Sequence, residues 1–433
     1  MSRRNRQKRT AKHHDRRRTS SRRERRSTDP GYDRAAILDH LAAALYNSAH
    51  CPAHDADFHA AELLNEFPSR ANDLDIAAEA ALTDAIAVAW RVGWSPNDLH
   101  EFARRRLDTS AAGYVAEAVV RESRQYPVST LHPRWRAELA ALPATVVPGA
   151  WQLRDWANRN AVDHRAALST VLKVLRFLGT LPKLQPLQPL PGENQHSAVE
   201  PNTADAKALS RVRALLAKAE ATNFPEEAET LSAKAQELMS RYSLHHAIRD
   251  HERGRAAEAT ARRIWIDNPY VIAKAALTQA VATANRCRIV CAEKVGFVAV
   301  IGADCDLEFV ELLSTSLLVQ ANRAMLAVGR TTTGTQARTR SFRQSFLLAY
   351  AARIGERLTA TSTTAATELD LDRLLPVLAA RSHATDDLTD KLFPSTIPRV
   401  MAASDGAITG AGGRLASTHH GLVVLNPEVL VAI

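Results

Sequence analysis

The chain has 433 residues, of which 45% are hydrophobic and 24% are charged, proportions typical of globular proteins. This length predicts two or three folded units, and the composition excludes a collagen-like, wholly disordered or membrane-spanning protein. Four cysteines are too few for a disulfide framework, and the charged N-terminus lacks the apolar core of a secretory signal, so we expect a soluble protein in the reducing cytoplasm.

The basic charge of the chain is concentrated near its N-terminus. The formal net charge is +9, but residues 1–26 hold 13 basic and two acidic side chains, a net charge of +11, whereas all other residues together carry −2. Residues 1–32 contain almost no large apolar side chains, which predicts a disordered Arg-rich tail. Flexible arginines bind phosphates, so the candidate nucleic-acid-binding residues are Arg3, Arg4, Arg6, Arg9, Arg16, Arg17, Arg18, Arg22, Arg23, Arg25 and Arg26. The alternative is a tail that only solubilises the protein.

Residues 33–181 are predicted to form a helical domain. Apolar residues recur at helical spacing from Ile37 to Leu45, and a second amphipathic run extends from Leu74 to Val92. The sequence Ser95-Pro96-Asn97-Asp98 is typical of a helix start, because serine caps the first turn and proline fits it. Five prolines then fall within residues 182–202, which predicts an extended linker.

Residues 203–252 are predicted to form an αα-hairpin whose turn lies at Thr222–Pro225. The first helix has an apolar stripe of Leu209, Val212, Leu216 and Ala219, and the second has one of Ala228, Leu231, Ala235, Leu238, Met239 and Tyr242. Neither stripe is wide enough to form a core alone, so we expect the hairpin to dock on another element. We expect Leu216, Leu231, Leu238 and Met239 to be buried.

Residues 253–433 are predicted to form an α+β domain. Two segments rich in Val and Ile, 287–292 and 296–302, flank Glu293-Lys294, which predicts a short β-hairpin. Helical patterns lie on both sides of it, the most regular over residues 341–358. The predicted fold class is therefore mainly α: a helical N-terminal domain, an αα-hairpin, and an α+β C-terminal region with a short β-hairpin.

The sequence offers few residues for a metal or catalytic centre. The densest group of potential zinc ligands is His50, Cys51, His54 and His59, but no second cluster follows at a fixed distance, so we expect no metal and no cofactor. No phosphate-binding loop, HExxH zinc motif or GxSxG nucleophile motif is present.

Three smaller features each allow two interpretations. Cys287 and Cys291 are four residues apart and are expected to be buried as small apolar side chains rather than to bind metal. Asp304 and Asp306 could bind a cation, although paired carboxylates are usually only solvated. The glycine-rich segment 410–414 could bind an anion or form a flexible turn.

The hairpin resembles the bacterial domain of unknown function 2786. The resemblance extends over Leu209–Tyr242 and is carried by a leucine-rich helix, by Asn-Phe-Pro-Glu-Glu-Ala at residues 223–228 and by Ala-Gln-Glu-Leu-Met at residues 235–239. Segments that resemble longer actinobacterial members of that family are Gly93–Leu99, Pro133–Trp135, Ser341–Leu358 and Leu375–Ala379. The family has no assigned activity, so the resemblance implies none. Some relatives occur beside zinc-peptidase-like domains, but the zinc motif of those domains is absent here.

Three functional hypotheses follow. The leading one is a non-enzymatic cytoplasmic protein that contacts nucleic acid non-specifically through its Arg-rich tail. The second is an enzyme, such as a metal-dependent hydrolase, with a site in residues 253–433. The third is a scaffold whose αα-hairpin binds a protein partner.

Overall fold

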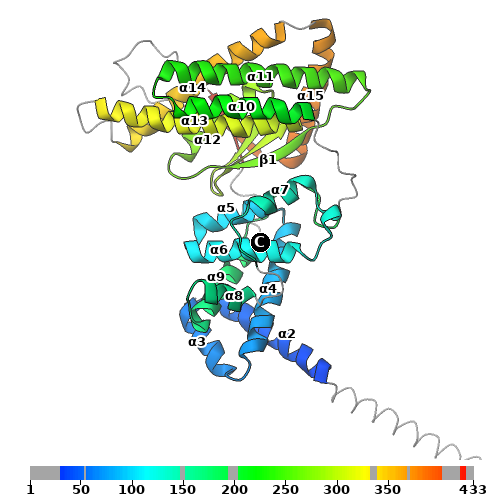
Figure 1. Ribbon diagram of the computed structural model, residues 1–433, viewed down its shortest axis with the longest axis vertical. Coiled ribbons are helices and arrows are strands. Elements are labelled where there is room, and N and C mark those ends of the chain that lie inside the picture. Colours follow the sequence, from blue (N-terminus) through cyan, green and yellow to red (C-terminus); the bar gives the residue numbers. More distant parts are fainter. Residues whose placement is uncertain are drawn as a thin grey trace, which may run out of the picture. The chain divides into compact units, whose positions relative to one another are not determined.

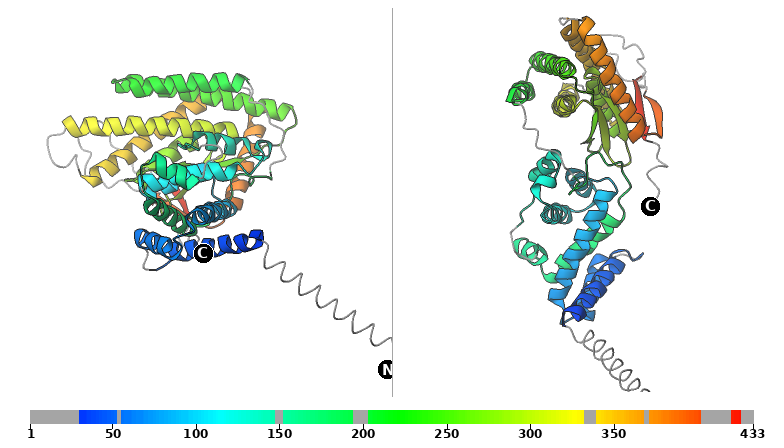
Figure 2. Two further views of the ribbon diagram at one scale, coloured as in Figure 1. Left: turned by 60° about the horizontal axis from the view of Figure 1, so that its bottom comes forward. Right: turned by 90° about the vertical axis from the view of Figure 1, so that its right-hand side faces the viewer.

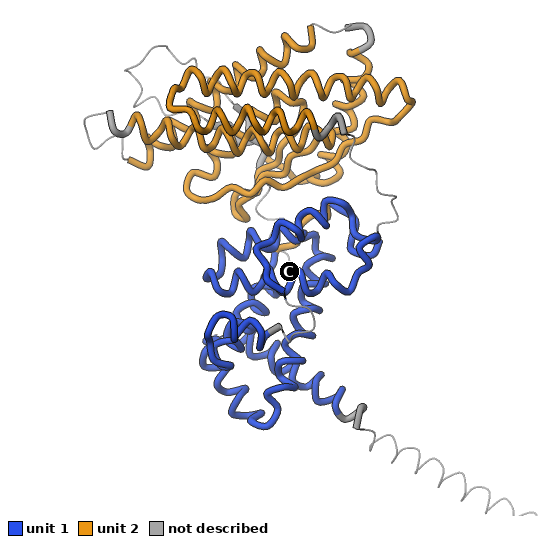
Figure 3. Tube along the Cα trace, in the orientation of Figure 1, with its two compact units in different colours: residues 1–181, 188–195 blue, residues 182–187, 196–433 orange. Residues whose placement is uncertain are grey.

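The computed structural model describes residues 30–52, 55–146, 152–193, 203–331, 339–367, 371–401 and 420–425. The chain divides into two compact units, which Figure 3 shows in different colours. Unit 1 comprises residues 1–181 and 188–195, and its described part is helical. Unit 2 comprises residues 182–187 and 196–433 and combines helices with a sheet. The fold is mainly α with some β structure, as the sequence predicts.

Several helices of unit 1 begin at residues whose side chains cap them. The elements are α2 (Pro30–Ala49), α3 (Ala56–Glu66), α4 (Ala71–Arg91), α5 (Pro96–Arg106), α6 (Thr109–Ser123), a 3-10 turn (Val128–Thr130), α7 (Pro133–Ala141), α8 (Gln152–Arg159) and α9 (His164–Gly179). The side chain of Ser95 accepts a hydrogen bond from the backbone of Asp98, which confirms the predicted start of α5. Asp55, Asp108 and Asp163 cap α3, α6 and α9 in the same way.

Unit 2 contains a five-stranded sheet with the order β1-β3-β2-β5-β4. Strands β1 (Thr260–Trp265), β3 (Phe297–Gly302) and β2 (Arg288–Ala292) pair antiparallel, and β2 and β3 form the predicted hairpin. Strand β5 (His420–Leu425) pairs parallel with β2 and antiparallel with β4 (Thr396–Met401). The sequence did not predict β1, β4 or β5, because β1 carries two consecutive arginines and β4 carries Pro398, which both weaken a strand pattern.

Helices cover both faces of the central strands. They are α10 (Thr203–Ala221), α11 (Pro225–Glu252), α12 (Val271–Ala284), α13 (Asp304–Thr331), α14 (Arg340–Thr367) and α15 (Leu371–Leu392) (Figure 1). One face of β2 and β3 packs against α12 and α13, and the other face contacts α15, so the strands are buried on both sides (Figure 2). At the crossing of α12 and α14, a side chain on Gly355 would meet the Cβ of Ala280 at 3.2 Å, so the helices approach closely there.

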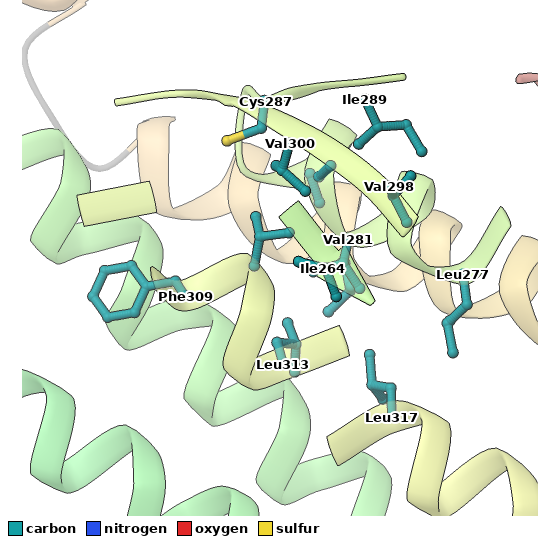
Figure 4. Close-up of a cluster of buried hydrophobic side chains, with 14 of the residues drawn as sticks. Ile264, Leu277, Val281, Cys287, Ile289, Val298, Val300, Phe309, Leu313 and Leu317 are labelled. Atoms are coloured by element: carbon teal, nitrogen blue, oxygen red, sulfur yellow. The ribbon is translucent and has the colours of Figure 1, made fainter. Parts of the chain in front are cut away.

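The αα-hairpin is an integral part of the core of unit 2. Val212 and Leu216 of α10 and Ala235 and Met239 of α11 belong to the same buried cluster as the sheet residues. The sheet, α12 and α13 contribute to that cluster through Ile264, Leu277, Val281, Cys287, Ile289, Val298, Val300, Phe309, Leu313 and Leu317 (Figure 4). Hence the hairpin docks on another element, as predicted.

The burial predicted for four hairpin residues is correct for two of them. Leu216 is 3% exposed and Met239 is fully buried, whereas Leu231 and Leu238 are only half-buried. Leu231 and Leu238 lie at the margins of the α11 stripe, where the neighbouring helices do not cover a side chain completely. Leu238 nevertheless packs against the cluster.

The proline-rich segment has contacts in each unit. Its described part, residues 182–193, contains no helix or strand. In unit 2, the carbonyl of Gln185 accepts a hydrogen bond from the guanidinium of Arg263. In unit 1, the amide of Gln188 donates a hydrogen bond of 2.7 Å to Glu138. Specific hydrogen bonds therefore attach the described part of this segment to each unit.

We expect Met239→Ala to lower the free energy of unfolding of the protein by about 2–5 kcal/mol, because the change leaves a cavity in the shared core. Urea denaturation followed by circular dichroism measures this difference. The control is Lys234→Ala on the same helix, whose side chain is 54% exposed and whose ion pair with Glu237 contributes little. Equal stability of the two variants would contradict a core that includes the hairpin.

Candidate functional site

The eleven arginines of the predicted nucleic-acid-binding segment, Arg3 to Arg26, lie outside the described residues, as do the glycine-rich segment 410–414 and His54. The structure instead shows how the two units use their other charged side chains. The pairing of these side chains decides which of them can bind a polyanion, because a carboxylate beside a cation neutralises its charge.

Carboxylates neutralise the central arginines of unit 1. Arg159 on α8 binds both oxygens of Glu117 at 2.6 and 3.0 Å, and this pairing raises the pKa of Arg159 above its ordinary value. Arg121 pairs with Glu79 at 3.0 Å. Asp75, which is 1% exposed, pairs with Arg154 at 3.1 Å. These pairs join α4, α6 and α8 around a polar interior rather than presenting charge to a ligand.

Several arginines of unit 2 are paired in the same way. Arg213 of α10 contacts Glu308 of α13 at 3.0 Å, and Arg288 of β2 contacts Asp386 of α15 at 2.8 Å. Arg262 pairs with Glu311, and Arg357 pairs with Glu229 of the hairpin. Most of these pairs link different helices or a helix and a strand, so they serve to hold elements together.

A cluster of charged side chains around Asp306 is the strongest candidate for a chemical site in unit 2. Asp306 lies in the first turn of α13 and is 3% exposed. The guanidinium of Arg381 on α15 lies 3.8 Å from its carboxylate, and Arg286, in the turn between α12 and β2, adds a second positive charge. Two helices, α13 and α15, and the turn between α12 and β2 therefore contribute charged side chains around one buried carboxylate.

Arg381 connects this carboxylate to α11. Its guanidinium donates to the hydroxyl of Ser243 at 3.3 Å and lies 3.5 Å from Nδ1 of His246. The same imidazole nitrogen lies 2.8 Å from Asp250. The negative charges of Asp306 and Asp250 are thus matched by the positive charges of Arg381 and Arg286.

The electrostatics of the cluster disfavour a nucleophilic thiol. Burial raises the pKa of Cys305 to about 12, and burial raises the pKa of Cys287 well above its usual range. Burial therefore favours the protonated form of both thiols, whereas a nucleophilic cysteine reacts as the thiolate. Burial raises the pKa of Asp306, while the nearby Arg381 and Arg286 oppose that shift.

Asp304 and Asp306, the two carboxylates that could bind a cation, do not belong to a group of metal-ligating side chains among the described residues. The carboxylate of Asp306 lies 3.8 Å from the guanidinium of Arg381. Cys287 and Cys291 are buried at 5% and 0% exposure, as predicted for apolar packing. Across the described residues, no group of three or more His, Cys, Asp or Glu side chains is arranged to hold a metal ion.

The histidines near Cys51 make separate contacts. The ring of His50 stacks on Tyr46 at 4.1 Å, and its Nδ1 lies 2.9 Å from the Tyr46 carbonyl. Its other nitrogen lies against Gly179, where an added Cβ would approach it to 2.1 Å. Nδ1 of His59 lies 2.9 Å from Glu62. Each ring therefore packs locally.

A buried polar network was not predicted from the sequence. The amide nitrogen of Gln236 on α11 lies 3.0 Å from the Asn285 side chain and 2.8 Å from the Ser362 hydroxyl on α14. Ser240 completes the network, and its hydroxyl lies 3.1 Å from both Gln236 and Ser362. Gln236 stands beside Ala235 and one turn before Met239, so a glutamine on a buried face was the signal that could have indicated it.

Residues 207–246 match the model of the family described as a protein of unknown function (DUF2786), which confirms the resemblance seen in the hairpin sequence. Searches of curated proteins and of solved structures found no match to this chain. The matched segment contains Gln236, Met239 and Ser243, which all face the interior of unit 2. The matched segment therefore includes residues that attach the hairpin to the rest of its unit.

We expect Arg381→Met to destabilise the protein more at about pH 8 than at about pH 5, with a loss of about 3 kcal/mol at the higher pH. Arg381 lowers the pKa of Asp306, so its removal raises that pKa further. A carboxyl group whose pKa is higher in the folded than in the unfolded state loses its stabilising contribution as the pH rises through the folded value.

Urea denaturation at the two pH values measures this effect, and Arg381→Lys serves as the control because it keeps the positive charge. An equal loss of stability at both pH values would show that Asp306 does not depend on Arg381.

Proposed function

We propose that the protein binds nucleic acid non-specifically through the arginines of its N-terminal segment, Arg3 to Arg26. The observation that carries this proposal is the separation of charge, because residues 1–26 have a net charge of +11 and the remaining chain has −2. In the described units, carboxylates neutralise many arginines, as in the Arg159–Glu117 pair. Residues 1–26 therefore hold the largest local excess of basic side chains in the sequence.

The physical basis of this binding is counterion release. Each arginine that contacts a phosphate displaces a condensed cation, which favours binding at low salt and does not depend on base sequence. Guanidinium groups suit this role because they can donate two hydrogen bonds to one phosphate. Such a segment would attach the two units to DNA or RNA in the cytoplasm without choosing a sequence.

The other two hypotheses have less support. The Asp306 cluster has balanced charge and protonated thiols, so it favours a structural role over an enzymatic one. The apolar stripe of the hairpin packs in the core of unit 2, so a protein partner would have to bind its outer face. Within the described residues, no helix is long and apolar enough to cross a membrane.

We expect the full chain to bind duplex DNA with an affinity that falls steeply with salt. With 13 basic side chains in the segment and some of them unused, the slope of log K against log salt should be roughly −4 to −8, since each phosphate contributes about −0.9. Fluorescence anisotropy at several salt concentrations, with duplexes of two unrelated sequences, gives this slope and its dependence on sequence.

Deletion of residues 1–29 should abolish most of this binding and leave the melting temperature unchanged, because the deleted segment has almost no large apolar side chains. A full-length variant with lysine at the eleven arginine positions is the control and should keep the salt slope. Undiminished duplex binding by the truncated protein, or no binding by the full chain at low salt, would refute the proposal.

A further inference from the structure

The longest stretch of the chain without acidic residues lies in unit 2. No Asp or Glu occurs from Leu312 to Gly355, a run of 44 residues that contains six arginines. The run includes most of α13 and the first half of α14. Its net charge is +6. The total charge of residues 27–433 does not reveal this excess, because acidic residues elsewhere bring that total to −2.

Three arginines of this run stand apart from the paired arginines elsewhere. Arg323 on α13 and Arg340 on α14 are exposed, and Arg343 is half-buried. None of the three has an ion-pair partner in the part of the chain that the structure describes. Arg353, further along α14, is different because its guanidinium lies 3.9 Å from Glu229.

Hydrophobic packing brings the end of α13 and the start of α14 together. Ala321 of α13 and Leu347 of α14 belong to one small buried cluster, and Met325 and Tyr350 pack against it. The two helices contact each other, and both are part of the helical layer in Figure 1. Arg323 lies in the same turn of α13 as Ala321 and Met325 but is exposed, so its side chain leaves the helix on the side away from this cluster. The contact between the helices nevertheless places Arg323 at the same end of unit 2 as Arg340 and Arg343.

An aromatic ladder follows these arginines along α14. Phe342, Phe346 and Tyr350 are spaced four residues apart and therefore lie on one face of the helix. The ring centroids of Phe342 and Phe346 are 6.4 Å apart, and those of Phe346 and Tyr350 are 6.3 Å apart. All three residues are half-buried, so each remains partly accessible.

We infer that this end of unit 2, formed by Arg323, Arg340, Arg343, Phe342 and Phe346, binds single-stranded nucleic acid. Unpaired arginines next to aromatic rings match the two contacts that such strands offer, because arginines bind the phosphates and aromatic rings stack on unpaired bases. In a duplex the base faces are stacked on each other, so this surface should prefer single strands. The inference goes beyond the proposed function because it does not depend on residues 1–26.

The first test is photo-crosslinking of the full chain to a single-stranded oligonucleotide of about 15 nucleotides that carries 4-thiothymidine, a length that spans such a site. Mass spectrometry of the digested complex then identifies the crosslinked peptides. We expect crosslinks in the peptide from residue 341 to 353, in addition to any in residues 1–29.

The second test compares two full-length triple variants that each lose three arginines. Arg323→Gln with Arg340→Gln and Arg343→Gln should weaken single-strand binding about tenfold and reduce the size of the salt slope by about 2, since each phosphate of a single strand contributes about 0.7. The control changes the exposed but ion-paired Arg34, Arg70 and Arg104 to Gln and should leave the slope unchanged. Phe346→Leu, which keeps an apolar side chain, should lower the affinity for single strands and leave the salt slope unchanged.

The outcomes separate this inference from the proposed function. Crosslinks confined to residues 1–29, with equal slopes for the two triple variants, would overturn the inference and leave the proposed function standing. Crosslinks at residues 341–353 of the full chain would support the inference. If, in addition, deletion of residues 1–29 left duplex binding unchanged, the proposed function would be refuted while the inference stood. Binding to phosphatidylserine vesicles without binding to the oligonucleotide would overturn the inference in favour of a membrane surface.

Discussion

The packing of α11 against the other helices and the sheet of unit 2 is the interaction on which the C-terminal half of the structure depends. Met239 packs in the apolar core, while the side-chain amide of Gln236 forms buried hydrogen bonds with Asn285 and Ser362. A buried amide costs free energy unless its hydrogen bonds are made, so the network admits one position of the hairpin only. The segment that matches DUF2786, residues 207–246, therefore contributes one part of a larger core and has no separate core of its own.

The distribution of acidic residues determines where the protein can meet a polyanion. Over most of the described units, arginines bind carboxylates of neighbouring elements, as Arg121 binds Glu79. Such pairs fix helices but offer little charge to a phosphate. Basic residues strongly outnumber acidic residues in two segments, residues 1–26 and residues 312–355. The first carries the arginines of the proposed function, and the second places Arg343 between Phe342 and Phe346 on α14.

Features encoded by adjacent residues could be predicted from the sequence, and features that depend on distant residues could not. The start of α5 at Ser95 and the hairpin of β2 and β3 follow from local patterns. The Asp306–Arg381 contact joins residues that are far apart in the chain, and neither has a distinctive neighbour. Strand β5 is recognisable only through its pairing with β2. The stretch without acidic residues, 312–355, could be recognised in the sequence. Only the structure shows that Arg323, Arg340 and Arg343 have no ion-pair partner among the described residues and that the rings of Phe342, Phe346 and Tyr350 follow one another along α14.

Arginine footprinting tests most directly the central claim that unpaired arginines carry the contact with nucleic acid. Phenylglyoxal modifies accessible guanidinium groups, and mass spectrometry measures the modification of each peptide with and without a single-stranded oligonucleotide. We predict protection of the arginines in residues 1–26 and of Arg323, Arg340 and Arg343, with little change at the ion-paired Arg70 and Arg104. Equal protection of paired and unpaired arginines, or protection of neither group, would contradict the claim.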